Sequence, residues 1–347
     1  MSRIVRGRAE LEAYLRDRGV DAATVLPPED DFSMAFVAPM SYLDLIDWRN
    51  PNDPIRRQVI PDSAEAEDDD ATLTDPIGDA AHSPVPGVVH RYRDRALLLL
   101  TAVCSVHCRF CFRRDFVGKP ASARRPEQID AAYAYVAAHP EIWEVIFSGG
   151  DILALPDTFI ADALARARAI PHVRVLRIHT RAPVVDPERV TERLIDELTA
   201  NAPTYVALHV NHPREVTPAL RVAMGRLSDR GVPLLAQTVL LRGVNDDPAV
   251  LETLFRALVE CRVRPYHLHH PDLARGTKHF RLPVRRGRTI VRETRSRLSG
   301  TAMPLYVLDI PGGHGKVPLE AAYVAENDGA YVAETFGGAR HSYRDVT

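Results

Sequence analysis

The chain has 347 residues, of which 46% are hydrophobic and 26% are charged, and its formal net charge is −2. This balance is that of an ordinary globular protein, and it gives no basic excess for binding nucleic acid. No run of eighteen apolar residues and no signal peptide is found, so we expect a cytoplasmic protein that does not enter a membrane.

The N-terminal part of the chain differs in pattern from the rest. Residues 1 to about 60 have helical periodicity interrupted by turn residues, and residues 62–87 are acidic and rich in turn residues. We therefore predict that residues 1–88 form a helical arm followed by a solvated acidic loop.

A regular alternation of strands and helices begins near residue 90. Nearly continuous apolar strands alternating with helices are typical of a parallel sheet covered by helices. We predict an α/β fold with an incomplete or complete (β/α) barrel over residues 89–310 and a C-terminal extension over 311–347, with an open doubly wound sheet as the alternative. In both folds the functional residues lie at the C-terminal ends of the strands. Strand-length apolar segments occupy 96–103, 144–149, 173–180, 204–210, 233–241, 264–270 and 304–309, and amphipathic segments include 127–139, 158–170 and 189–200.

Three cysteines follow the first of these strands with the spacing C-x3-C-x2-C. Thiolates of Cys104, Cys108 and Cys111 on one tight loop can hold three irons of a [4Fe–4S] cluster, whose usual complement is four cysteines. The fourth iron is then open to a substrate or cofactor. A zinc site with His107 or Cys261 as the fourth ligand is the alternative.

Two glycine-rich segments follow other strands. After the second strand come Ser148, Gly149, Gly150 and Asp151, in which glycines allow close backbone approach and the carboxylate accepts hydrogen bonds from an ammonium group. Lys316 ends the segment Pro-Gly-Gly-His-Gly-Lys, which lacks the spacing of a phosphate-binding P-loop. Such a segment can bring a lysine amine to pyridoxal phosphate, although an ordinary loop lysine remains the alternative.

The cysteine spacing, the aromatic Phe110 before the last cysteine and the Ser-Gly-Gly-Asp segment resemble the radical S-adenosylmethionine superfamily. Longer phrases resemble the lysine 2,3-aminomutase family from roughly residue 53 to about 325; they include FSGGD, HTRAPVV, HVNHP, QTVLLRGVND, DLARGTKHFR and DIPGGHGK. The resemblance implies an incomplete barrel of the radical S-adenosylmethionine type, and an isomerase that uses a [4Fe–4S] cluster, S-adenosylmethionine and pyridoxal phosphate.

The resemblance also implies a role for each matching residue. The three cysteines would bind the cluster, Lys316 would bind pyridoxal phosphate, and Arg113 would bind the substrate carboxylate. Asp272 and Asp309 match two carboxylates that bind the side-chain ammonium of lysine. Further cofactor contacts would come from Arg91 at the pyridoxal phosphate group, and from Phe110, Ser148, Gly149, Gly150, Asp151, His209 and Gln237 around S-adenosylmethionine.

By this resemblance the reaction converts L-lysine to β-lysine: an adenosyl radical removes a β-hydrogen, and the nitrogen migrates from Cα to Cβ. Two converging carboxylates disfavour glutamate, whereas arginine remains an alternative substrate, and β-lysine for modification of elongation factor P remains an alternative use. An electron donor such as flavodoxin or ferredoxin is implied, and a homo-oligomer is possible. The rival interpretations are a metal-dependent hydrolase using His267, His269 and Asp272, and a non-catalytic iron–sulfur protein.

Overall fold

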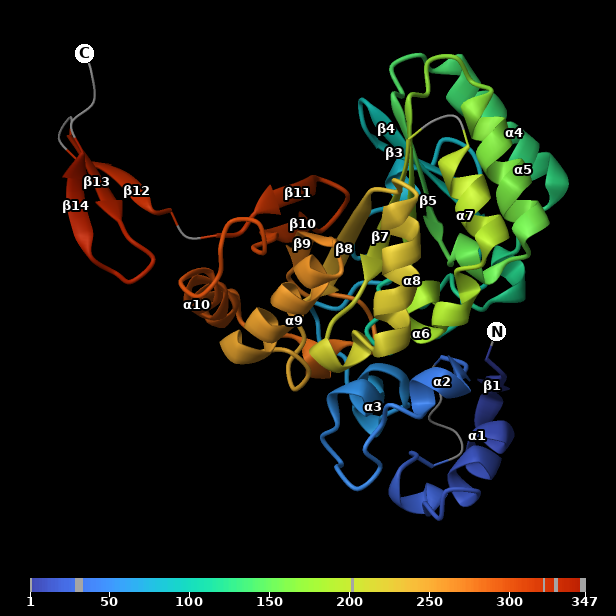
Figure 1. Ribbon diagram of the computed structural model, residues 1–347, viewed down its shortest axis with the longest axis horizontal. Coiled ribbons are helices and arrows are strands. Elements are labelled where there is room, and N and C mark those ends of the chain that lie inside the picture. Colours follow the sequence, from blue (N-terminus) through green and yellow to red (C-terminus); the bar gives the residue numbers. More distant parts are fainter. Residues whose placement is uncertain (1, 29–33, 201–202, 321, 328–329, 344–347) are drawn as a thin grey trace.

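The computed structural model describes residues 2–28, 34–200, 203–320, 322–327 and 330–343. Within these ranges the central feature is a nine-stranded sheet in the order β11-β10-β9-β8-β7-β6-β5-β4-β3, which curves into a nearly closed barrel (Figure 1). The strands are β3 (Val88–Tyr92), β4 (Arg95–Thr101), β5 (Glu144–Gly149), β6 (Val175–Thr180), β7 (Thr204–His209), β8 (Leu234–Val239), β9 (Arg264–His269), β10 (Leu305–Ile310) and β11 (Gly315–Pro318).

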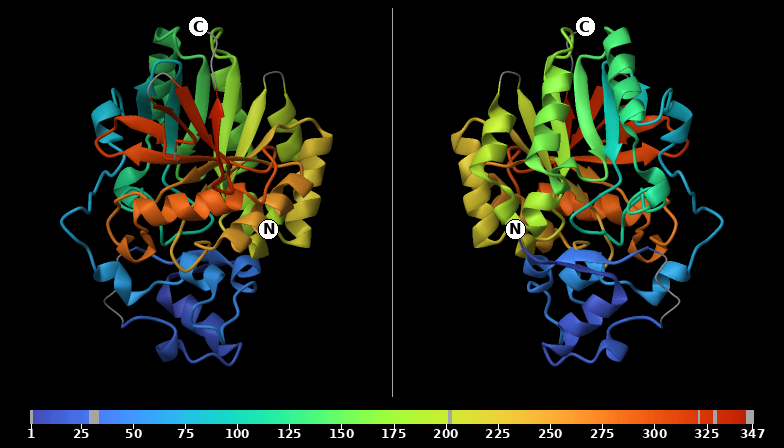
Figure 2. Two further views of the ribbon diagram at one scale, coloured as in Figure 1. Left: turned by 90° about the vertical axis from the view of Figure 1, so that its left-hand side faces the viewer. Right: turned by 90° about the vertical axis from the view of Figure 1, so that its right-hand side faces the viewer.

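Helices cover the outside of this sheet, as an α/β barrel requires. The apolar outward faces of the strands pack against them, with Leu98, Phe147 and Leu176 among the fully buried residues of the main core. The covering helices lie between successive strands and are seen on the outer side in both views of Figure 2. They are α4 (Pro126–Ala138), α5 (Asp157–Arg168), α7 (Glu192–Thr199), α8 (Pro218–Asp229), α9 (Pro248–Glu260) and α10 (Val284–Arg295), with the short α6 (Ala182–Val185) after β6.

The seven strands predicted from the sequence are present as β4 to β10, and they run parallel to one another. The parallel (β/α) barrel predicted for these strands is confirmed, and two edge strands that were not predicted extend it: β3 pairs antiparallel with β4, and β11 pairs antiparallel with β10. Both edge strands are joined to their neighbours by tight hairpins, and neither has the length or the apolar periodicity that identified the other strands.

The N-terminal arm has its own hydrophobic core, built from α1 (Gly7–Arg16), α2 (Met40–Leu43), α3 (Pro54–Val59) and the paired strands β1 (Ile4–Arg6) and β2 (Val37–Pro39). This core also includes Val106 from the cysteine loop and Val185 from the segment after β6. The arm therefore packs against the C-terminal ends of the barrel strands, as Figures 1 and 2 show.

The prediction that the acidic segment 62–87 is a solvated loop is wrong for its key side chains. Glu65, which lies in a 3₁₀ turn (Ser63–Ala66), is 3% exposed and forms ion pairs with Arg109 and Arg114. Leu73 makes a β-bridge with Ala274. The sequence pattern does not show that Glu65 will meet two buried arginines next to the cysteines. Because of these contacts, part of the segment packs against the barrel and is not surrounded by solvent.

The C-terminal extension begins with a strand. Lys316, predicted to lie in a loop, is in β11, where it faces Asp309 of β10 in the antiparallel register. Three further strands, β12 (Val324–Asn327), β13 (Ala330–Glu334) and β14 (Arg340–Tyr343), form a separate antiparallel sheet that projects from the barrel (Figure 1). In the part of the chain that the structure describes, no helix has the length and apolar character needed to cross a bilayer.

Candidate active site

A cavity of about 440 Å³ occupies the interior of the barrel. Every site residue predicted from the sequence lines it, from the cysteine loop at one end to Lys316 at the other. This convergence follows from the fold, because residues at the C-terminal ends of parallel strands meet at the same edge of a sheet.

The cysteine loop lies at the arm-covered end of the cavity. Cys104, Cys108 and Cys111 are all free thiols and partly exposed to the cavity. Burial raises the pKa of Cys111 to about 12, and burial together with neighbouring negative charges raises the pKa of Cys104. Because a thiolate is the form that binds metal, a cationic group placed here would relieve this penalty.

The zinc alternative does not fit this loop. His107 points toward the arm, where its Nδ1 is 2.8 Å from the Ala35 carbonyl, and Cys261 follows the end of α9 away from the cavity. Among the described residues, no three His, Cys, Asp or Glu side chains converge as ligands of a single metal ion. The same result removes the hydrolase set of His267, His269 and Asp272. A [4Fe–4S] cluster has no such requirement, because each cysteine binds a different iron.

The predicted S-adenosylmethionine residues lie beside the cysteine loop. The rings of Phe110 and His209 are 5.2 Å apart, and His209 faces Gln237 in the register of β7 and β8. His209 Nε2 is buried without a hydrogen-bond partner among the described residues, and burial lowers the pKa of this histidine to about 3. A neutral imidazole with an unsatisfied nitrogen facing a cavity is suited to a polar ligand.

The Ser148–Asp151 segment brings its backbone close to the loop that follows β4. A Cβ atom on Gly150 would lie 2.4 Å from the Val103 carbonyl oxygen, so only glycine fits there. The Asp151 carboxylate accepts hydrogen bonds from the Thr180 hydroxyl and from the backbone N–H groups of Leu153, Arg181 and Ala182. Asp151 therefore joins the ends of β5 and β6, and little of its carboxylate remains for the ammonium contact predicted from the sequence.

Lys316 lies at the opposite side of the cavity, paired with a predicted substrate residue. Its Nζ donates to Asp309 Oδ1 at 2.6 Å, and the other oxygen of Asp309 is 3.4 Å from His269 Nδ1. The hydrogen bond from His269 and the positive charge of Lys316 lower the pKa of Asp309 despite its burial. Gly315, with φ +90°, places the Lys316 backbone N–H 2.9 Å from the Tyr92 hydroxyl, which accepts its hydrogen bond.

Asp272 lines the same cavity but has no hydrogen bond or ion pair with the described residues. Burial and the negative charge of Asp309 raise the pKa of Asp272 to about 7, and Asp79 contributes in the same direction. A cation stabilises an unpartnered carboxylate that lies near a second carboxylate, so the electrostatics of this part of the cavity suit a cationic ligand.

Arg91 and Arg113 share one carboxylate that the sequence analysis did not select. Asp79 accepts from Arg113 Nε at 2.7 Å and from Arg91 Nη2 at 3.2 Å. Arg113 Nη1 also donates to the Ser148 hydroxyl at 3.1 Å. Asp79 lies in the segment predicted to be solvated, and only the folded structure reveals its pairing across 34 residues.

Two more cavity residues were missed. His179 is at the end of β6, has a buried Nε2 without a partner among the described residues, and has a pKa lowered by burial and by nearby cationic groups. Arg181, two residues later, donates from Nη1 to the Cys108 sulfur at 2.8 Å. Their positions at a strand end were a signal, but the sequence analysis gave no reason to separate them from other polar residues.

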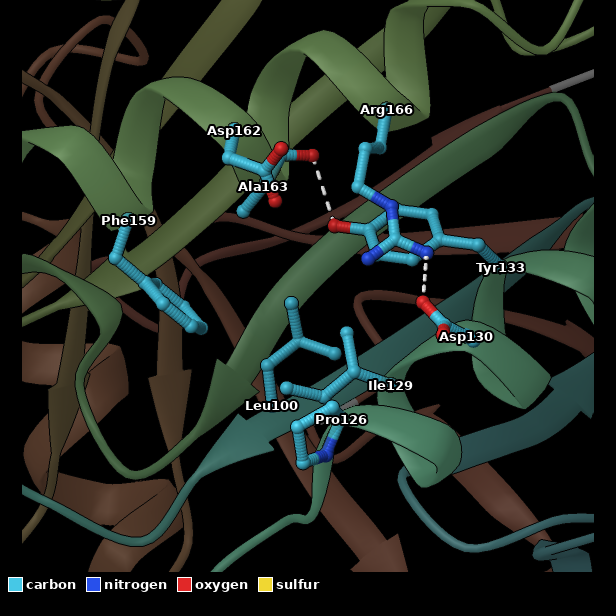
Figure 3. Close-up of a pocket in the computed structure, with 9 residues that line it drawn as sticks. All are labelled: Leu100, Pro126, Ile129, Asp130, Tyr133, Phe159, Asp162, Ala163 and Arg166. Carbon is cyan, nitrogen blue, oxygen red and sulfur yellow. Dashed lines mark hydrogen bonds and ion pairs between the residues drawn. The ribbon is translucent and has the colours of Figure 1, made fainter.

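A second hollow, of about 240 Å³, lies between α4, α5 and the outer face of β4 (Figure 3). Its polar groups are paired locally: Arg166 binds Asp130 at 2.7 Å, and the Tyr133 hydroxyl donates to the Ala163 carbonyl at 2.8 Å. It contains none of the predicted site residues, so the barrel interior is the candidate active site.

The chain is similar to known proteins over most of its length. The profile described as the Radical SAM superfamily matches residues 98–254. An L-lysine 2,3-aminomutase of Fusobacterium nucleatum is 44% identical over 305 residues, which cover 88% of this chain and 72% of that protein. An L-lysine 2,3-aminomutase of Escherichia coli is 41% identical over 82% of this chain and 83% of that protein. A glutamate 2,3-aminomutase of Clostridioides difficile is 36% identical over 84% of this chain and 69% of that protein.

Proposed function

The chain belongs to the lysine 2,3-aminomutase family of radical S-adenosylmethionine enzymes, and from this premise we propose that it moves the α-amino group of L-lysine to the β-carbon. As a family member it is an isomerase that depends on a [4Fe–4S] cluster, S-adenosylmethionine and pyridoxal phosphate. The observation that carries the choice of lysine is the pair of carboxylates, Asp272 and Asp309, that face one cavity.

The residues present suit all three groups. Cys104, Cys108 and Cys111 would hold the cluster, the surface around Phe110 and His209 would hold S-adenosylmethionine, and Lys316 would hold pyridoxal phosphate. When bound, the cluster and S-adenosylmethionine supply a carbon radical able to take hydrogen from an unactivated carbon, and pyridoxal phosphate supplies a carbonyl that binds amines and a ring that spreads an unpaired electron.

Charge in the cavity determines how an amino acid would lie in it. Arg113 offers a planar donor fork to the substrate carboxylate, while Asp79 on its Nε holds the guanidinium in place. Asp272 and Asp309 would receive a cationic side chain at the other side. A glutamate side chain would add a third negative charge beside these two aspartates, which disfavours the activity named for the Clostridioides difficile relative.

The chain also limits side reactions. The N-terminal arm packs over the cysteine loop and reduces access of water to that end of the cavity. Among the described residues that line the cavity, the only thiols are the three cluster cysteines, and Cys261 is buried elsewhere. A radical in the cavity would therefore meet no free S–H group once the cluster is bound.

The remaining parts of the proposal concern the setting of the enzyme. A small amino acid as substrate is consistent with the names of the relatives. We further propose that a flavodoxin or ferredoxin supplies the electron that reduces the cluster. A cytoplasmic location is supported by four free cysteines, which are typical of a reducing compartment. A homo-oligomer, and the division into residues 1–88, 89–310 and 311–347, stay predictions. Arginine as substrate and elongation factor P as the destination of β-lysine stay alternatives.

The test is turnover by anaerobically reconstituted protein with S-adenosylmethionine, pyridoxal phosphate and a chemical reductant. Lysine, arginine and glutamate are supplied separately, and products are identified by mass spectrometry. We expect β-lysine from lysine and no product from glutamate. Turnover of glutamate in preference to lysine would overturn the substrate assignment while leaving the family assignment intact.

A further inference from the structure

Arg181 is a buried cation in direct contact with the cysteine loop. It is 5% exposed and donates from Nη1 to Cys108 Sγ at 2.8 Å. Its guanidinium carbon also lies 5.2 Å from the centre of the Phe110 ring, which precedes Cys111 in the same loop. The contact thus joins the end of β6 to the sulfur of a predicted cluster ligand.

A network of acceptors fixes the other nitrogen of this guanidinium. Arg181 Nη2 donates to Glu215 Oε1 at 2.7 Å, to the Tyr42 hydroxyl at 2.7 Å and to Gln58 Oε1 at 2.6 Å. Glu215 is fully buried and is itself held by the backbone N–H groups of Asn211 and His212. Arg181 is therefore held in one orientation by the arm and by the segment after β7, with Nη1 directed at Cys108.

A hydrogen bond to a cluster-ligating sulfur has a defined electrostatic effect. Reduction adds one electron to the cluster, and much of the added negative charge is carried by the sulfurs, so an N–H donor stabilises the reduced state more than the oxidised state. In this step an external reductant gives up one electron, the cluster gains it, and the guanidinium neither gains nor loses a proton.

We propose that Arg181 is a positioning residue that raises the reduction potential of the cluster through its hydrogen bond to Cys108. The inference rests on the proposed cluster site and concerns a residue that touches the cluster ligand, not the substrate. The fixed charge of Glu215 sets where the guanidinium lies, and the N–H to sulfur bond transmits the effect.

The test compares the potential of the reconstituted parent with that of Arg181→Lys. A lysine keeps the charge but cannot serve Cys108 and the three Nη2 acceptors together, so the bond to sulfur is lost. We expect the equilibrium constant for one-electron reduction to fall about tenfold, which corresponds to about 59 mV, in a redox titration followed by electron paramagnetic resonance.

Arg189→Lys is the matched control. Arg189 is equally buried, 5% exposed, but it binds the Leu153 and Leu155 carbonyls and Asp157, with no contact to a cysteine. We expect the parent potential in this variant. A shift of equal size in both variants would overturn the inference, because any buried arginine would then have the same effect.

A second measurement does not depend on whether Arg181→Lys folds. Protein labelled with ¹⁵N-arginine is reduced, and pulsed electron paramagnetic resonance is used to detect coupling between the cluster spin and an arginine nitrogen. Coupling in the parent and in Arg189→Lys supports the bond, whereas its absence from the parent overturns the inference even if Arg181→Lys does not fold. A parent that binds no cluster overturns the proposed function together with the inference; a cluster with unchanged potential and unchanged coupling in Arg181→Lys overturns the inference alone.

Discussion

The charged side chains at the two ends of the barrel cavity differ in how fully they are paired with other residues. At the cysteine end, Arg181 and Glu215 are buried and bound to fixed partners, and Asp151 is held by four donors. At the lysine end, Asp272 has no partner among the described residues, and Asp309 is held by Lys316. Saturated groups fix geometry, whereas groups with unused bonding capacity are available to a ligand. Arg181, Glu215 and Asp151 therefore hold the segments around the cysteines in place, while the carboxylate of Asp272 remains available to a ligand.

We expect the largest effect from replacing the cysteines that would bind the cluster. Replacing Cys104, Cys108 or Cys111 by Ala removes one of three iron ligands, so we expect loss of the cluster and no detectable cleavage of S-adenosylmethionine. Iron content and formation of deoxyadenosine measure this. Cys261→Ala is the control and should keep both, since Cys261 lies outside the cavity; cluster loss only in that variant would refute the assignment.

Lys316→Ala should remove the attachment point of pyridoxal phosphate while leaving the cluster site intact. We expect no borohydride-reducible attachment of pyridoxal phosphate and no isomerase activity, with the iron content of the parent, because Lys316 does not contact the cysteines. Peptide mapping after reduction identifies the labelled lysine in the parent. Label on Lys278 or another lysine would show that Lys316, in the β10–β11 hairpin, does not bind pyridoxal phosphate.

Asp272→Asn and Asp309→Asn test the proposed binding site for the lysine side chain. Each removes one carboxylate from a buried cation site, which costs roughly 3–5 kcal/mol, so lysine should bind about two to four orders of magnitude more weakly. Calorimetric titration of the loaded enzyme measures this. Because both carboxylates hold one ammonium, the double variant should lose less than the sum of the two. Binding of lysine at the parent affinity in both single variants would contradict the proposed site.

A smaller effect concerns pH. Asp272, with a pKa of about 7, must be ionised to bind a cation, so it is mostly neutral at pH 6 and mostly charged at pH 8. The apparent dissociation constant for lysine should therefore fall about tenfold between these values, since only the ionised fraction is competent. The matched control is Asp272→Asn, in which this dependence should flatten. An equal slope in both proteins would exclude Asp272 as the titrating group.

The smallest effect concerns the residue that holds Arg91 and Arg113. Asp79→Asn weakens two charge-assisted hydrogen bonds without emptying the cavity, so we expect about fivefold weaker binding of lysine and of pyridoxal phosphate, the equivalent of one net hydrogen bond. Asp75→Asn offers a comparison within the same segment, because among the described residues Asp75 accepts hydrogen bonds from backbone N–H groups alone, those of Asp79 and Ala80, and contacts neither arginine. Loss of affinity in Asp75→Asn but not in Asp79→Asn would contradict this role.

The predictability of each part depends on how local its signal is. The cysteine spacing, the Ser-Gly-Gly-Asp turn and Lys316 are short segments whose chemistry can be read from neighbouring residues. The strands β4 to β10 were predictable because each is long and apolar. Glu65, Asp79 and Arg181 instead each have an ionic partner 34 or more residues away, and the charge pattern along the chain does not determine which distant charge a residue will contact.

The edge strands were not predicted from the sequence for a related reason. β11 contains only four residues, Gly315–Pro318, and its identity as a strand comes from the antiparallel bonds it makes with β10. Two of its residues, Gly315 and Pro318, have low strand propensity. Tertiary pairing decided the structure there, against the local preference of the residues.

The β10–β11 hairpin restricts which length changes this enzyme can tolerate. Lys316 faces Asp309 because four residues, 311–314, connect the two strands in a fixed register. Insertion or deletion of a single residue in that turn would place Gly315 or Val317 opposite Asp309 and would direct the lysine to the other face of the sheet. Such a chain would keep its barrel and its cysteine loop, yet its amine would face away from the cavity. Natural or engineered length variation is therefore expected at the C-terminal sheet and not in this turn.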